Sequence, residues 1–370
     1  MIKIVAVTST RADYGLLSSL LEVIRDDTNF DLRLVVTGTH LSAKYGMTVN
    51  EIQNDGFTVH CKIKINLCVD TPVALTISAA NLTQKIAKTL DSIKPDAILI
   101  LGDRFEILTV AYAAAIQSIP VIHIHGGELT LGAIDNKMRF AISHLADYHL
   151  TATEKSRQRL IDIGISSRHA VFTGAIGVEN ALNLSKFSRQ EIEVKTGWQF
   201  LEKNILFTFH PETISKLDTR QQIDRVLDGL EKFQEAAKFI TMPNVDPGNR
   251  TILERIRAFI KHQPNTYFIE SLGHKLYLSV MNEVDVVVGN SSSGIIEAPA
   301  LGIPTVNIGE RQSGREQASS IIQCGFDAED IRNSIRQALI KTSALSLSRH
   351  PYYHQHTSKS MVMAIKSFLT

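Results

Sequence analysis

The stretch Val284-Asp-Val-Val-Val-Gly-Asn-Ser-Ser-Ser-Gly294 decides the fold class, because a β-branched run leads directly into a glycine-bounded turn. The following residues, Ile-Ile-Glu-Ala-Pro-Ala at 295–300, favour a short helix. Strand, turn and helix in that order form the repeating unit of a parallel sheet. Outward from this stretch, short β-branched runs alternate with longer helical patterns along the whole chain. The sequence therefore predicts an α/β protein with doubly wound parallel sheets.

Two sets of expected strands divide the chain. The first set comprises 2–7, 32–37, 97–101, 121–125, 149–151 and 170–173, and the second comprises 204–209, 239–242, 266–269, 285–288 and 305–308. Helices are expected at 16–25, 106–117, 221–237 and 250–261. Residues 174–203 are polar and suggest few regular elements, so we expect the chain to cross between domains there. Because 370 residues exceed one ordinary core, we expect domains at 1–174 and 175–354.

Composition excludes several classes of protein. Hydrophobic residues make up 44% and charged residues 21%, which is typical of a chain with a sizeable core. The net charge of +1 gives no overall field for nucleic acid or an anionic membrane, so we expect neither as a partner. The apolar run at 1–7 is too short for a signal peptide or a membrane span. The odd set Cys61, Cys68 and Cys324 lacks metal-ligand spacing and favours a reducing, cytoplasmic location.

The serine-rich turn is the first candidate site, because ligands of open parallel sheets bind beyond the carboxyl ends of the strands. Amides at the start of a helix and the hydroxyls of Ser291, Ser292 and Ser293 suit a pyrophosphate. Glu297, one turn further on, can accept hydrogen bonds from ribose hydroxyls. The alternatives are an N-cap made by one serine and a solvated glutamate on a helix surface.

Arginines after strands in both domains are the second candidate group. Arg11 follows the first expected strand, and Arg311 and Arg315 follow the strand at 305–308. Together they can clamp a diphosphate, although surface arginines are also common. The chain has no Gly-x-Gly-x-x-Gly after a strand and no Gly-x4-Gly-Lys-Ser/Thr, which excludes dinucleotide and P-loop sites.

Candidates for acid–base chemistry also lie at strand ends. Asp103 and Glu128 follow expected strands, Asp135 lies in the next loop near Arg139, and His210 ends the first strand of the second domain. Carboxylates gathered in one cleft would push their pKa values apart, and histidine can transfer a proton near neutral pH. Each of these groups can instead cap a helix, pair with an arginine or serve in packing.

His123 and His125 stand two apart on one expected strand and face the same side, as a metal pair would. A third ligand at suitable spacing and an Asp-x-Asp motif are both missing from the sequence. We therefore interpret these histidines as buried and hydrogen-bonded, and expect no metal.

Taken together, these motifs resemble the UDP-N-acetylglucosamine 2-epimerase family, and most closely its hydrolysing branch. The resemblance runs in order over almost the whole chain. Its motifs are Ser9-Thr-Arg-Ala-Asp-Tyr14, Gly102-Asp-Arg104, His125-Gly-Gly-Glu128, Ile134-Asp135 with Arg139, His210-Pro211, Gly289-Asn-Ser-Ser-Ser-Gly294, and Gly309 to Arg311 with Gly314-Arg315. Non-hydrolysing relatives carry His-x-Glu-Ala-Gly after the corresponding strand, so His125-Gly-Gly-Glu128 favours hydrolysis.

The resemblance implies two Rossmann-like domains facing across a cleft, as in glycosyltransferase-B folds, with a C-terminal helix (355–370) packing back on the first domain. The implied UDP ligands are Arg11, Asn244, Ser291, Ser292, Ser293, Glu297, Arg311 and Arg315. The implied sugar site holds Asp103, Glu128, Asp135 and His210, supported by Arg104 and Arg139. The implied reaction is elimination of UDP to a 2-acetamidoglucal, then addition of water to give N-acetylmannosamine for sialic acid synthesis. No cofactor is required, and a homodimer or homotetramer is expected.

Three alternatives stay open. A sibling hydrolysing epimerase acts on UDP-2,4-diacetamido-2,4,6-trideoxyglucose. A glycosyltransferase of the same fold would use the same UDP loop but would need an acceptor. A non-catalytic UDP-sugar binding protein would keep the cleft, although binding uncharged sugar hydroxyls does not need three carboxylates.

Overall fold

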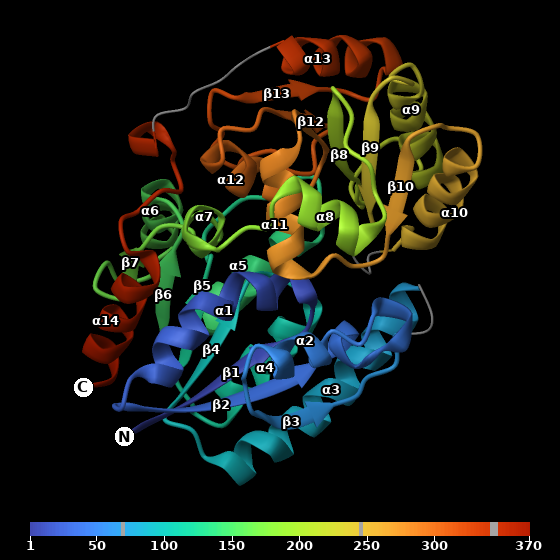
Figure 1. Cartoon of the computed structure of the whole chain (residues 1–370). Helices are drawn as coiled ribbons and strands as arrows, with labels where there is room; N and C mark the ends of the chain where they lie inside the picture. The colour runs from blue at the N-terminus through green and yellow to red at the C-terminus, as the bar shows by residue number, and fades with distance from the viewer. Residues whose placement is uncertain (68–70, 244–246, 341–346) are drawn as a thin grey trace. The chain divides into compact units, whose positions relative to one another are not determined.

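The computed structural model describes residues 1–67, 71–243, 247–340 and 347–370. The chain forms two compact units (Figure 1). Unit 1 comprises Met1–Glu128, Asp135–Asn180 and His354–Thr370, and unit 2 comprises Leu129–Ile134 and Ala181–Tyr353. The short segment Leu129–Ile134 thus groups with unit 2, although both its neighbours in sequence belong to unit 1. Among the described helices, none has the length and apolar character needed to cross a bilayer.

Unit 1 is built on a parallel sheet whose seven described strands have the order β3-β2-β1-β4-β5-β6-β7. The strands are β1 (Ile2–Thr8), β2 (Phe30–Thr37), β3 (Val59–Ile63), β4 (Ala97–Leu101), β5 (Val121–Ile124), β6 (Tyr148–Thr151) and β7 (Ala170–Phe172). The helices are α1 (Arg11–Asp26), η1 (Gly38–Leu41), η2 (Ala43–Tyr45), α2 (Val49–Asn54), α3 (Pro72–Ile93), α4 (Phe105–Ile116), α5 (Asp135–Leu145), α6 (Glu154–Asp162) and α14 (Thr357–Leu369). Helix α7 (Ile176–Asn183) begins in unit 1 and ends in unit 2. The strand order reverses between β1 and β4, which is where open sheets bind ligands.

Both faces of this sheet are covered, as its apolar strands require. In β1, Ile4 packs in a core with α1 and α14, whereas Val5 packs in a separate core with α3 and α4. The C-terminal helix α14 contributes Met361 and Ile365 to the first of these cores. β1 and β4 pair directly, so the loops that follow them start side by side at one edge of the sheet.

Unit 2 repeats the architecture with a parallel sheet of six described strands in the order β10-β9-β8-β11-β12-β13. The strands are β8 (Asn204–Thr208), β9 (Ala237–Thr241), β10 (Thr266–Ile269), β11 (Val286–Gly289), β12 (Thr305–Ile308) and β13 (Ile321–Cys324). The helices are α8 (Arg189–Thr196), α9 (Thr219–Glu231), α10 (Asn249–Ile260), α11 (Gly273–Glu283), α12 (Ser292–Ala300), α13 (Ala328–Ile340) and η3 (Leu347–Arg349). Here the order reverses between β8 and β11, which places the loops after these strands together.

The structure differs from the sequence prediction at the sheet edges. β3 and β13 are not among the predicted strands, and each lies at an edge where its side chains are largely half-exposed. A partly solvated strand needs no continuous apolar run, so the hydrophobic pattern is weak there. Helix α9 ends at Glu231 instead of continuing to 237, because Ala237 is already the first residue of β9.

The predicted crossing region 174–203 also contains more structure than expected, because α7 and α8 both lie within it. Ser188 and Glu191 form a capping box at the start of α8, and Gly197 ends it with φ 71°. Capping residues of this kind mark the two ends of a helix, and a prediction from apolar periodicity alone does not take them into account. Cys61 and Cys324 are free thiols, and Cys68 lies outside the described residues.

Candidate active site

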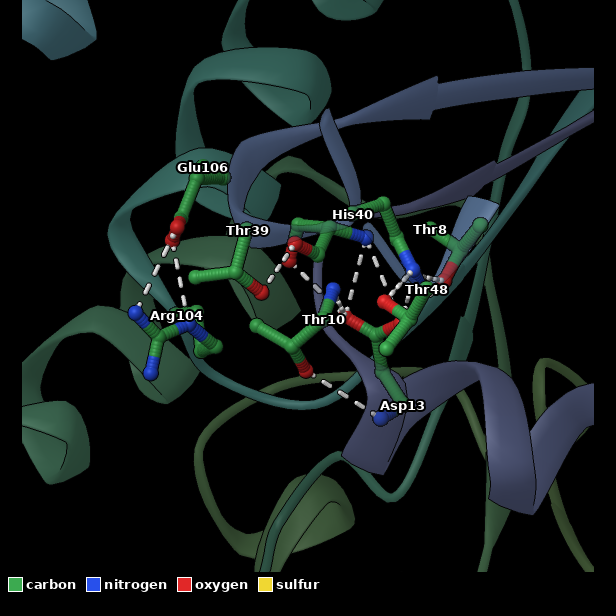
Figure 2. Close-up of polar contacts among 9 residues, drawn as sticks. Thr8, Thr10, Asp13, Thr39, His40, Thr48, Arg104 and Glu106 are labelled. Carbon is green, nitrogen blue, oxygen red and sulfur yellow. Dashed lines mark hydrogen bonds and ion pairs between the residues drawn. The ribbon is translucent and has the colours of Figure 1, made fainter. Parts of the chain in front are cut away.

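In unit 1, a buried carboxylate holds the loop that follows β1. Helix α1 begins at Arg11, with Thr10 and Asp13 forming a capping box (Figure 2). Asp13 accepts hydrogen bonds from the backbone N–H groups of Ser9 (3.1 Å) and Thr10 (3.0 Å), and from the Ser9 hydroxyl (2.8 Å). The Thr8 hydroxyl also donates to it. Asp13 thereby fixes the first turn of α1, which carries the predicted diphosphate ligand Arg11.

The loop after β2 closes on the same carboxylate. His40 is fully buried; its Nε2 lies 2.9 Å from the Thr8 hydroxyl and its Nδ1 lies 2.7 Å from the Thr48 hydroxyl. Gly38 has φ 62°, and a side chain there would overlap the Ser9 carbonyl. Burial alone would raise the pKa of Asp13, but the hydrogen bond and charge of His40, with the Thr8 and Ser9 hydroxyls, hold that pKa below its ordinary value.

At the end of β4, Asp103 forms an ion pair with Arg139 of α5. The Arg139 side chain is 2% exposed, whereas that of Asp103 is 21% exposed. The guanidinium is therefore the anchored member of the pair, and the carboxylate is the member that a ligand can reach. The sequence predicted both residues as site candidates, and the structure brings them together.

Arg104 pairs with a different carboxylate, Glu106, at the start of α4. Its Nε lies 3.2 Å from Glu106 Oε2 and its Nη2 lies 3.3 Å from Oε1 (Figure 2). Burial raises the pKa of Glu106, and the charge of Arg104 opposes part of that rise. Arg104 thus compensates a buried acid on α4, a role that the sequence did not suggest.

His123 is hydrogen-bonded to the backbone of Gly102, the residue that precedes Asp103. Its Nε2 lies 2.8 Å from the carbonyl of Gly102, and its Nδ1 lies 3.3 Å from the Ser143 hydroxyl. Burial lowers the pKa of His123 to about 3, so the ring is neutral at pH 7. Because a carbonyl only accepts, Nε2 carries the proton and Nδ1 accepts from Ser143. This histidine is buried and hydrogen-bonded, as the sequence interpretation expected.

His125 and Glu128 lie together after β5. Nδ1 of His125 is 3.6 Å from Glu128 Oε1, and both side chains are buried. His125 has φ 65°, a left-handed conformation that is uncommon outside glycine. Asp135 follows as the first residue of α5 and is half-buried. In the described residues, no group of three or more His, Cys, Asp or Glu side chains is placed to hold a metal ion.

In unit 2, Asn290 holds the backbone of His210, the second residue after β8. The Asn290 side chain accepts from the His210 N–H at 2.7 Å and donates to the His210 carbonyl at 2.9 Å. The Asn290 carbonyl accepts from Arg311 Nη1 at 3.3 Å and from the Gln312 side chain at 2.8 Å. One asparagine therefore connects the predicted proton-transfer histidine to the predicted diphosphate ligand.

Glu212 holds the loop that carries Arg311. Its Oε1 accepts from the backbone N–H groups of Glu310 (2.6 Å) and Arg311 (2.9 Å). Gln222 fixes the backbone of Glu212 through bonds to its N–H (3.0 Å) and carbonyl (3.2 Å). Burial raises the pKa of Glu212, the two backbone amides and Arg311 oppose that rise, and Glu310 adds to it.

The serine turn begins α12. Ser291 caps the helix by accepting from the Ser293 N–H at 3.4 Å, which is the capping role foreseen as the alternative. Ser293 Oγ lies 2.6 Å from the Tyr277 hydroxyl and 3.0 Å from Ser291 Oγ. Ser292 is the first helical residue, and Glu297 lies further along the same helix with 6% exposure. One serine of the turn is therefore used as a helix cap. Binding of an anion by the other amides and hydroxyls of the turn stays a prediction.

The structure thus groups the candidates by unit. Unit 1 brings Asp103 to Arg139 and Glu128 to His125. Unit 2 connects His210 and Arg311 through Asn290, beside the serine turn, and the Arg315 N–H donates to the carbonyl of Gln312. The predicted UDP ligand Asn244 lies outside the described residues. Sequence reasoning did not name His40, Glu212, Asn290 or Tyr277 as site residues. The first three lie beside or inside strand-end motifs, and that position was the available signal.

Comparison with known proteins decides the family. The sequence model described as UDP-N-acetylglucosamine 2-epimerase matches residues 22–366. The chain belongs to this family. It is 34% identical over 372 residues to polysialic acid biosynthesis protein P7 of Escherichia coli, covering 100% of this chain and 95% of that protein. It is 35% identical over 345 residues to the hydrolysing UDP-N,N'-diacetylbacillosamine 2-epimerase of Legionella pneumophila, covering 92% and 89%.

Two further proteins extend the comparison. The UDP-N-acetylglucosamine 2-epimerase of Neisseria meningitidis is 32% identical over 339 residues, covering 91% of this chain and 88% of that protein. The structure of the Methanocaldococcus jannaschii UDP-GlcNAc 2-epimerase in complex with UDP-GlcNAc and UDP matches with a TM-score of 0.81 at 17% identity, covering 99% of this chain and 100% of that chain. The expected family, enzyme class and glycosyltransferase-B-like α/β fold are therefore confirmed.

Proposed function

We propose that the protein is a hydrolysing 2-epimerase that converts UDP-N-acetylglucosamine to UDP and N-acetylmannosamine for sialic acid synthesis. The observation that carries the proposal is the Asp103–Arg139 pair, in which a buried guanidinium leaves a carboxylate accessible at the switch point of the unit 1 sheet. The similarity to a polysialic acid biosynthesis protein and to hydrolysing epimerases supports the same reaction. The His125-Gly-Gly-Glu128 motif favours the hydrolysing branch.

The proposed reaction has two stages. A carboxylate takes the proton from C2 while the bond from C1 to the diphosphate oxygen breaks, and its electron pair leaves with UDP to give a 2-acetamidoglucal. Water then adds its oxygen to C1, and C2 receives a proton on the face opposite to the one that lost it. One of Asp103, Glu128 and Asp135 acts as base and another as acid, and His210 is available for proton transfer.

The C2 proton is only weakly acidic, so departure of UDP must be stabilised at the same time. Guanidinium groups bind phosphate oxygens with two parallel hydrogen bonds, and this assigns Arg11, Arg311 and Arg315 to the diphosphate. The Ser291–Ser293 turn adds the amides and hydroxyls at the start of α12, and Glu297 is assigned to the ribose. Asn244 belongs to the same proposed set.

A second substrate has its own support. UDP-2,4-diacetamido-2,4,6-trideoxyglucose is the systematic name of UDP-N,N'-diacetylbacillosamine, and the Legionella relative is named for that sugar. The same carboxylates can act at C2 of either sugar, because the two differ at C4 and C6. Steady-state kinetics with both nucleotide sugars, compared as kcat/KM, assigns the substrate.

Product analysis without an acceptor tests the proposal. Purified protein incubated with UDP-N-acetylglucosamine should release UDP and N-acetylmannosamine, identified by proton NMR. A glycosyltransferase would show no turnover until an acceptor is added, and a binding protein would show none at all. A released sugar that keeps the gluco configuration would contradict epimerisation.

Assembly and location complete the proposal. We infer a cytoplasmic homodimer or homotetramer from the family resemblance, and the free thiols of Cys61 and Cys324 are compatible with a reducing compartment. Light scattering coupled to size-exclusion chromatography measures the assembly directly, and a 41.0 kDa species alone would contradict it.

A further inference from the structure

A series of buried side chains connects the loop after β2 to the loop after β1. The Thr48 hydroxyl lies 2.7 Å from His40 Nδ1, His40 Nε2 lies 2.9 Å from the Thr8 hydroxyl, and that hydroxyl bonds Asp13 (Figure 2). None of these four residues is more than 6% exposed. Asp13 in turn fixes the first turn of α1, where Arg11 is the first residue.

The two hydrogen bonds that link His40 to Asp13 through Thr8 have a defined direction. A carboxylate only accepts, so the Thr8 hydroxyl donates its single proton to Asp13. The Thr8 oxygen must then accept from His40, which places a proton on Nε2. Nδ1 bonds the Thr48 hydroxyl, accepting from it in a neutral ring and donating to it in a charged one. His40 is therefore the group that orients the Thr8 hydroxyl toward Asp13.

The contact between Thr48 and His40 leaves helix α2 without a side-chain capping hydrogen bond. Thr48 is the N-cap residue of α2, yet its hydroxyl makes no capping hydrogen bond to that helix. A threonine at an N-cap ordinarily stabilises its helix by accepting from a backbone N–H in the first turn. Here the hydroxyl is committed to His40 instead, so the contact to His40 replaces a contact that would stabilise α2.

Hydrogen bonds that do not involve His40 also hold these two loops together. The Thr39 N–H donates to the Ser9 carbonyl at 2.9 Å, and the Thr39 hydroxyl donates to the same oxygen at 3.2 Å. Gly38 allows this close approach. What His40 adds is the orientation of Thr8 and Asp13, and through them the geometry of the first turn of α1.

We propose that His40 is a positioning residue for Arg11, acting through Thr8 and Asp13 to hold this arginine in the orientation that binds the diphosphate of the UDP-sugar. The inference rests on the proposed function, since it assigns Arg11 to that diphosphate. It predicts that changes remote from the ligand, at Thr48 or His40, alter UDP affinity only while Arg11 is present.

A double-mutant cycle on the full chain tests this proposal. Thr48→Val removes the outermost hydroxyl with little change in shape, and we expect it to weaken UDP binding by about threefold to tenfold, measured by calorimetry. In an Arg11→Ala background the same change should have no further effect. The matched control is Thr83→Val, which removes a hydroxyl bonded within α3 to the Ala79 carbonyl; UDP affinity should not change.

His40 itself gives an independent comparison. His40→Gln keeps an N–H donor for Thr8, whereas His40→Leu keeps none, so the glutamine variant should retain more UDP affinity. Thermal unfolding identifies any variant that fails to fold. If His40→Leu fails to fold, Thr48→Val still tests the proposal. Equal UDP affinity for wild type and Thr48→Val, or an equal loss with and without Arg11, would overturn the positioning role. Absence of UDP binding by the wild type would instead overturn the proposed function.

Discussion

The strand-end regions of the two units use the same pair of chemical groups in opposite roles. In unit 1, the Arg139 side chain is 2% exposed and Asp103, its partner, is 21% exposed. In unit 2, Glu212 is 6% exposed and holds the backbone of Arg311, whose side chain is half-buried. Unit 1 therefore buries a guanidinium to present a carboxylate, and unit 2 buries a carboxylate to present a guanidinium.

This difference suggests a division of labour. A presented carboxylate can take or give a proton, whereas a presented guanidinium binds phosphate oxygens. We expect loss of the proton-transfer groups, the unit 1 carboxylates and His210, to affect mainly turnover, and loss of the phosphate-binding arginines to affect mainly UDP affinity.

The largest effect is expected for Asp103→Asn. Loss of an acid–base carboxylate should lower kcat by about 100-fold to 10,000-fold while UDP affinity stays within about twofold of wild type. Steady-state kinetics and calorimetry measure the two quantities. Asp91→Asn, at an exposed position near the end of α3, is the control and should match wild type. Glu128→Gln and His210→Ala should also lose turnover, and loss of UDP affinity in all three would remove the division of labour.

The second largest effect is expected for Arg311→Ala. Removing a guanidinium that binds phosphate should weaken UDP binding by about 10-fold to 100-fold, which calorimetry measures directly. Arg250→Ala removes an arginine of the same unit that is 84% exposed, and its affinity should be unchanged. Unaltered UDP affinity in Arg311→Ala would show that this loop does not bind the diphosphate.

Asp13→Asn should reduce stability by about 2 kcal/mol at neutral pH, because an amide NH2 would face groups that donate to both carboxylate oxygens. The pKa of Asp13 is below its ordinary value of 3.8. Its stabilising contribution is thus present above about pH 4 and is lost as the pH falls through the folded-state pKa. Urea unfolding of both proteins between pH 3 and pH 7 should show their difference shrinking at the acid end. A difference that is constant with pH would contradict this assignment.

The smallest effect on stability is expected for Glu212→Gln. Its dependence on pH should be opposite to that of Asp13→Asn. One oxygen of Glu212 accepts both backbone amides, so glutamine can keep these bonds. The pKa of Glu212 is above its ordinary value of 4.5, so its favourable contribution exists at low pH and is lost as the pH rises through the folded-state pKa. The variant should equal or exceed wild-type stability at pH 7, by at most about 1 kcal/mol. Clear destabilisation at pH 7 would show that ionised Glu212 stabilises the loop.

The sequence predicts the strands around the switch points because they are buried on both faces and read as continuous apolar runs. It misses β3 and β13, whose edge positions leave their side chains half-exposed. It identifies Asp103 and Arg139 separately from strand-end position and family resemblance. Their pairing across 36 residues depends on how α5 packs beside α4 and β5, and no local pattern encodes that arrangement.

The residues that hold the site are harder to predict than those that face the ligand. Glu212 follows the His210-Pro211 motif, but its partners lie 98 and 99 residues away on the loop after β12. His40 lies in a strand-end loop, yet its contact with Thr8 depends on the register of β1 against β2. Such roles arise from sheet topology, so they become visible only once the strands are in place.

The proposed elimination is tested most directly by running the reaction with UDP-N-acetylglucosamine in deuterated water and locating the isotope in the product by NMR. Because the C2 proton is lost and C2 is reprotonated from solvent, the N-acetylmannosamine released should carry deuterium at C2. Product that retains protium at C2 would contradict the account.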